Sequence, residues 1–142
     1  MPFYKTSELK TVTLASGSAG EFQPVAGERM KASLVTFRRE KGSVPHWHEK
    51  EEQFILVLEG RRYMLVGEEE RVVGPGDLVH IPPGTLHSGR TIGEKALVFV
   101  VKSPAEDKDL GADQHFPPNA KEIAARLEAK ARELGARGGG PS

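Results

Sequence analysis

Short apolar runs alternate with glycine and proline through the first three-quarters of the chain. The runs are rich in Val, Ile, Leu, Phe and Tyr, and turn-forming residues separate them at close intervals. Short strands with regular turn signals are typical of an all-β sandwich or barrel. The strands predicted from this pattern are 11–14, 30–38, 44–48, 53–58, 61–66, 71–73, 77–82 and 95–102.

Two of these runs, 54–58 and 96–101, are apolar on both faces. A strand with one face in water should alternate between apolar and polar residues instead. One face can line the interior of a barrel, but the other then needs cover, either from the N-terminal strands or from a second subunit. We expect a homodimer.

The dipeptide Glu59-Gly60 predicts a two-residue hairpin turn, because glycine tolerates the positive φ that such turns require. The resulting register places Gln53 on the inward face and opposes Arg62 to Val57. Arg62 would then point inward at a position that is normally apolar. We expect it to extend out of the closed barrel end rather than hold an anionic substrate group.

The C-terminal part of the chain has a different pattern. The sequence of residues 105–118 predicts a loop. Asn119 is a plausible N-cap for an Ala-rich helix that ends near Gly135. Its narrow apolar stripe suggests packing on the outside of the barrel. The predicted organisation is N-terminal strands and loop at 1–29, a barrel core at 30–104, loop and helix at 105–135, and a disordered tail at 136–142.

Composition excludes several kinds of chemistry. There is no cysteine, so disulfides, thiolate metal sites and cysteine nucleophiles are ruled out. Twenty cationic and twenty anionic residues give zero formal net charge, with no electrostatic footprint for nucleic acid or an anionic membrane. No secretory h-region or membrane-length apolar run occurs. We expect a cytoplasmic protein whose partner is a small molecule.

Three histidines carry the strongest chemical signal. His46 and His48 are two residues apart, so on a strand they share one face and can approach the same ion. The turn Pro82-Pro83-Gly84 ends a strand and presents His87 just beyond it. Imidazole suits divalent Mn, Fe, Zn, Ni or Cu. By the same alternation, His80 is expected to point outward.

These residues resemble the two motifs of the cupin superfamily, including its small quercetin-dioxygenase-like members. The first motif matches at His46, His48 and Gly60, with Gln53 where glutamate is usual. The second matches at Gly76, Pro82, Gly84 and His87, with Thr91 where asparagine is usual. The resemblance covers residues about 30 to 101.

The resemblance implies a double-stranded β-helix, or jelly-roll barrel, that holds one divalent transition metal through His46, His48, His87 and the residue at position 53. Glu52 competes with Gln53 as the fourth ligand, because the spacing from His48 permits either. Strand alternation favours Gln53.

A metal with four neutral ligands keeps its full charge and acts as a strong Lewis acid. Such a centre suits isomerase or lyase chemistry, whereas a carboxylate as fourth ligand would suit dioxygen chemistry. The predicted function is a metal-dependent enzyme acting on a small oxygenated molecule, of the dioxygenase, isomerase or lyase type. The alternative is a module that binds a small molecule without turnover. The sequence singles out no catalytic acid or base.

Overall fold

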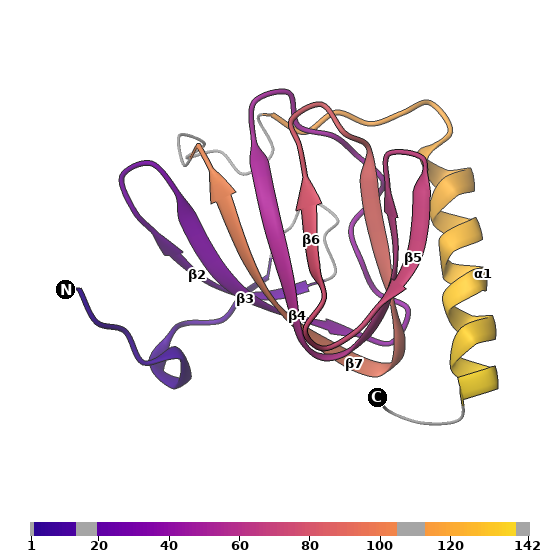
Figure 1. Ribbon diagram of the computed structural model, residues 1–142, viewed down its shortest axis with the longest axis horizontal. Helices are drawn as coiled ribbons and strands as arrows, with labels where there is room; N and C mark the ends of the chain where they lie inside the picture. Colours follow the sequence, from indigo (N-terminus) through magenta and orange to yellow (C-terminus); the bar gives the residue numbers. More distant parts are fainter. Residues whose placement is uncertain (1, 14–19, 105–112, 139–142) are drawn as a thin grey trace.

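A single antiparallel sheet, curled on itself and flanked by one helix, makes up most of the molecule (Figure 1). The computed structural model describes residues 2–13, 20–104 and 113–138. After a 3-10 turn (Thr6–Glu8), the elements are β1 (Val12–Thr13), β2 (Gly20–Ala26), β3 (Lys31–Arg38), β4 (Glu52–Val66), β5 (Glu69–Val73), β6 (Leu78–Ile81), β7 (His87–Ser103) and α1 (Ala120–Gly138).

Two long strands, β4 and β7, organise the sheet. The strand order is β1-β2-β3-β7-β4-β5, with β6 paired to β4. The first half of β4 pairs with the second half of β7, and the second half of β4 pairs with the first half of β7. Both strands therefore run through the two sides of the curled sheet. This arrangement is the jelly-roll architecture that the sequence predicted.

The predicted hairpin at Glu59-Gly60 is wrong. Residues 53–58 and 61–66 are parts of the one strand β4, and the ladder with β7 shifts register on either side of Glu59. Gly60 has φ +77°, and a Cβ there would collide with the Lys95 carbonyl oxygen on β7. The glycine therefore bends a continuous strand, because two backbones approach too closely for a side chain.

Other strand boundaries also differ from the prediction. The sequence pattern did not identify β2, and β7 begins at His87 rather than near residue 95. Residues 44–48 form isolated bridges rather than a strand, at His46 with His87 and at Trp47 with His115.

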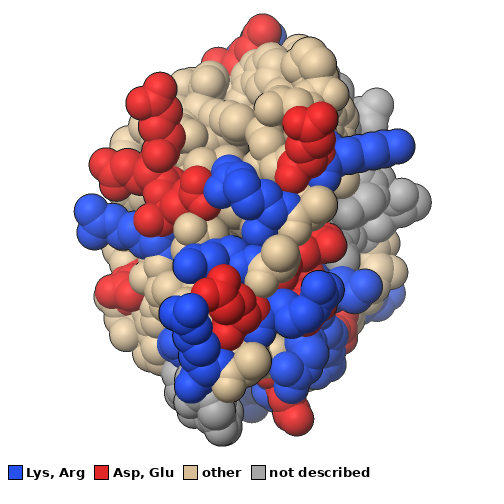
Figure 2. All heavy atoms as spheres, turned by 90° about the vertical axis from the view of Figure 1, so that its right-hand side faces the viewer, with Lys and Arg blue, Asp and Glu red and all other residues tan. Residues whose placement is uncertain are grey.

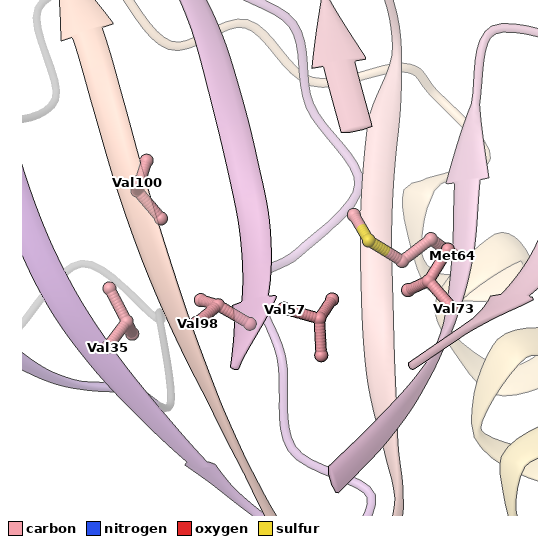
Figure 3. Packing of buried hydrophobic residues seen from close by; sticks show 6 residues of the cluster. All are labelled: Val35, Val57, Met64, Val73, Val98 and Val100. Carbon is pink, nitrogen blue, oxygen red and sulfur yellow. The ribbon is translucent and has the colours of Figure 1, made fainter. Parts of the chain in front are cut away.

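The apolar core lies inside the curled sheet. Figure 3 shows six side chains from β3, β4, β5 and β7 that point toward one another: Val35, Val57, Met64, Val73, Val98 and Val100. Valine suits this position because its β-branched side chain packs well on a pleated surface. The same inward positions lead along β4 and β7 from the core to Gln53 and Lys102, so the core and the site form one continuous interior.

Helix α1 packs on the outside of the sheet against β7 and β4, as predicted. Leu127 and Ala131 are buried there, and Glu128 forms an ion pair with the buried Arg90 of β7. The helix extends to Gly138, beyond its predicted end at Gly135; residues 139–142 of the predicted tail and most of the predicted loop lie outside the described residues.

Acidic and basic side chains are mixed over the face that carries α1 (Figure 2). None of the helices in the described ranges is both long enough and apolar enough to cross a bilayer.

The bend at Gly60 can be tested against Gly67, which also has positive φ but ample space around its Cα. We expect Gly67→Ala to cost about 1 kcal/mol of unfolding free energy, from left-handed backbone strain alone. Gly60→Ala should cost about 3 kcal/mol, because the β4–β7 ladder must also shift. Urea denaturation of both variants measures the difference, and equal losses would contradict the close-approach explanation.

Candidate metal centre

The three histidines singled out by their spacing meet at one end of the interior. His46 and His48 lie in the segment between β3 and β4, and His87 is the first residue of β7. His46 and His87 exchange backbone hydrogen bonds of 3.2 and 2.9 Å, which fixes the segment to the sheet. One ring nitrogen from each histidine lies within 4.8 Å of the others, and all three side chains are buried.

Each imidazole is oriented by a hydrogen bond to a backbone carbonyl. The Nδ1 atoms of His46, His48 and His87 lie 2.6, 2.9 and 3.0 Å from the carbonyl oxygens of Val44, Asp113 and Thr85. A carbonyl oxygen can only accept, so Nδ1 carries the proton in each ring. In a neutral ring the lone pair is then on Nε2, and that nitrogen can bind a metal.

Burial keeps two of these rings neutral. Desolvation lowers the pKa of His46 to about 4 and that of His87 to about 3, against the opposing effect of the bonds to Val44 and Thr85. Both rings are uncharged at neutral pH, so each keeps a lone pair that can bind a cation, and that of His87 is engaged by the Gln53 amide in the structure.

Gln53 and Glu52 face opposite sides of β4. Gln53 is 5% exposed, and its Nε2 lies 3.1 Å from His87 Nε2. Glu52 is exposed and accepts a hydrogen bond of 2.7 Å from His80, whose ring stacks on Phe54 outside the sheet. The outward prediction for His80 is confirmed. The face expected for Gln53 is also observed, although the hairpin used to argue for it does not exist.

Asp113 supports the histidine cluster, and no sequence pattern predicted this role. Its carbonyl orients His48, and its carboxylate accepts hydrogen bonds from the backbone N–H groups of Glu49, Lys50 and Glu51. Burial raises the pKa of Asp113, but these three donors outweigh that effect and lower it overall. A carboxylate far along the chain thus holds the turn that follows His48.

The imidazoles open into a cavity enclosed by the sheet. Its walls include the apolar side chains of Phe22, Phe37 and Val98, and its empty volume is about 1190 Å³ including the opening to solvent. Lys102 also lines it and lies 3.3 Å from Glu51, whose other oxygen lies 3.5 Å from His48 Nδ1.

The position of Arg62 differs from the one predicted from the sequence. Instead of extending into solvent, it is 4% exposed and lines the cavity. Its Nη1 donates to the Lys41 carbonyl and to Thr91 Oγ1, and its guanidinium lies 3.8 Å from the centre of the Phe37 ring. Burial lowers the pKa of Arg62 to about 9, with a smaller contribution from Arg90, so the side chain stays cationic at neutral pH. The predicted hairpin, which does not exist, would have placed Arg62 at a barrel end.

Known proteins resemble the chain in both sequence and fold. Over 81 residues it is 30% identical to quercetin 2,3-dioxygenase of Bacillus subtilis (strain 168), an alignment that covers 57% of this chain and 22% of that protein. The structure of KdgF from Halomonas sp. superposes with a TM-score of 0.68 at 26% identity, over 75% of this chain and 96% of that one.

The polyketide cyclase RemF from Streptomyces resistomycificus superposes with a TM-score of 0.70 at 20% identity, over 92% of this chain and 97% of its own, which is a likeness of fold. Residues 33–102 match the cupin domain family, and this segment contains the three histidines, Gln53 and the β3–β7 framework that holds them. The chain belongs to the cupin superfamily.

Proposed function

We propose that His46, His48, His87 and Gln53 bind one divalent transition metal and that the protein is an enzyme acting on a small oxygenated molecule in the adjoining cavity. The observation that carries this proposal is the buried cluster of three imidazoles, each bonded through Nδ1 to a backbone carbonyl and each with a ring nitrogen within 4.8 Å of the others. Mn, Fe, Zn, Ni and Cu all accept imidazole ligands. The amide oxygen of Gln53 would complete the set after a flip of the side-chain amide, whose nitrogen faces His87 Nε2 in the structure.

A metal bound by neutral ligands supplies a Lewis acid that polarises a carbonyl, enol or carboxylate oxygen. The protein's own part is to place the substrate between apolar walls and beside charged side chains. The ion pair formed by Lys102 and Glu51 lies next to the histidine cluster, in reach of a molecule bound in the cavity. The dioxygenase, isomerase and lyase classes all fit these requirements, and the similarity to a quercetin dioxygenase supports an oxygenated substrate.

Elemental analysis of the purified protein tests the metal. We expect about one equivalent of a transition metal in the wild type and almost none in a His48→Ala, His87→Ala double variant, because two of four ligands are removed. His80→Ala is the control, since it removes an exposed histidine outside the cavity. Absence of metal after reconstitution of the wild type would rule out the metalloenzyme. Bound metal without turnover of any oxygenated substrate would leave a binding module.

The fourth ligand can be tested by two neighbouring substitutions. Gln53→Ala should weaken metal binding about tenfold or more in a competition titration with a chelator, because a buried ligand is lost. Glu52→Ala should leave affinity unchanged, since its carboxylate bonds His80 on the outer face. The reverse result would identify Glu52 as the ligand.

We further propose that the chain forms a homodimer through the outer face of β4, β6 and β7. Apolar side chains from the three strands are neighbours there in the sheet register: Phe54 faces Val101, Leu56 faces Phe99, and Leu78 faces Leu56. Leu78 is 62% exposed and Phe54 is 42% exposed. Neighbouring exposed apolar side chains of this kind, with the polar pair of His80 and Glu52 beside them, are a feature of subunit interfaces.

Sedimentation or light scattering tests the dimer. We expect a particle of twice the 15.5 kDa chain mass for the wild type, and a monomer for Leu78→Glu, because a charge would be buried at the interface. Val72→Glu changes an exposed apolar residue on β5 and should leave the dimer intact. A monomeric wild type would overturn the proposed interface.

A further inference from the structure

The charge of the cavity wall is one-sided. Three cationic side chains line it, Lys31, Arg62 and Lys102, and none of the described lining residues carries a carboxylate; Lys102 pairs with Glu51 just outside the lining, which leaves Lys31 and Arg62. Lys31 and Lys102 are directly opposed across the β3–β7 ladder, and both are partly exposed. Arg62 is buried more deeply, beside the core residues Phe37 and Val73. Positive charge at the rim and at the inner wall favours entry of an anion.

The two buried arginines differ in how their charge is compensated. Arg90 is 3% exposed, points toward α1 and forms an ion pair with Glu128. Arg62 is equally buried, yet within the described ranges it forms no ion pair, and its Nη2 and Nε make no hydrogen bond. A buried cation without an acidic partner is costly, so a counter-charge supplied from the cavity would be strongly favoured.

Arg62 also lies close to the histidine cluster. A Cβ built on Gly89 would be 2.6 Å from Arg62 Nη2, so the guanidinium rests directly against that glycine on the inner face of β7. Gly89 follows His87 by two residues on the same face. At the usual rise of a β-strand the two positions are roughly 7 Å apart, a span that one small molecule can bridge.

We propose that Arg62 is an anion subsite: it binds a carboxylate of the substrate through Nη2 and Nε while the oxygenated part of the same molecule lies at the histidine cluster. The substrate class is thus a small oxygenated carboxylate. The placement of the oxygenated part at the histidine cluster rests on the proposed function, whereas the anion subsite at Arg62 depends only on the residues of the cavity. The unused guanidinium edge matches a carboxylate in planar, two-pronged geometry.

The test uses protein stripped of metal with a chelator, so that failure of the metal proposal cannot affect it. Acetate is the probe and acetamide its neutral control, and thermal unfolding and calorimetry are the readouts. We expect acetate, but not acetamide, to raise the Tm of the wild type saturably. Arg62→Gln should weaken acetate binding about tenfold or more, because a charge-assisted pair is lost. Arg61→Gln, which removes a neighbouring cation outside the cavity lining, should bind like the wild type.

The measured quantity is the acetate-dependent increment, which a purely structural role for Arg62 would not change. If Arg62→Gln does not fold, Arg62→Lys replaces it: charge is kept but the planar fork is lost, so binding should weaken severalfold. Equal stabilisation of the wild type and the Arg62 variants, or no saturable effect of acetate on the wild type, would overturn the subsite.

Discussion

The site depends on the hydrogen bonds from imidazole Nδ1 to backbone carbonyls. Three rings, from two separate segments, each bond a carbonyl, and the carbonyls belong to Val44, Thr85 and Asp113. These bonds fix both the rotation of each ring and the position of its proton, which a histidine in solution exchanges freely. The fold must therefore hold three carbonyls as accurately as it holds the rings. The reciprocal backbone bonds between His46 and His87 contribute directly to that accuracy.

The bend in β4 and β7 explains why the histidine cluster and a closed core can share one interior. A straight strand of this length could not follow both sides of a curled sheet. Gly60 allows the close approach to β7 at the bend, and the core valines fill the space beside it. Because side chains alternate along each strand, the inward positions continue from Val57 to Gln53 and from Arg62 toward His87. Packing of the core thus sets the depth and direction of the cavity.

Much of the fold and part of the site could be predicted from the sequence. The all-β class, the outer helix and the convergence of three histidines follow from local patterns and from the spacing of histidine, glycine and proline. Long-range contacts could not be predicted. Glu59-Gly60 has the sequence of a hairpin turn, but pairing with β7, more than thirty residues away, makes it a bend instead. Asp113 orients His48 from a separation of 65 residues, and no local pattern reports such a contact.

Among the sequence predictions that were wrong, the one that Arg62 extends into solvent has the most consequence for function. An arginine at an inward strand position is usually explained by a long side chain that returns its charge to water. Here the bend places Arg62 beside Gly89, where the absence of a side chain leaves room for the guanidinium inside the sheet. The charge stays in the interior, stacked on Phe37, although desolvation lowers its pKa. A fold that keeps an uncompensated cation beside the histidine cluster has an interior suited to a negatively charged molecule, because any anion that enters relieves the cost of that burial.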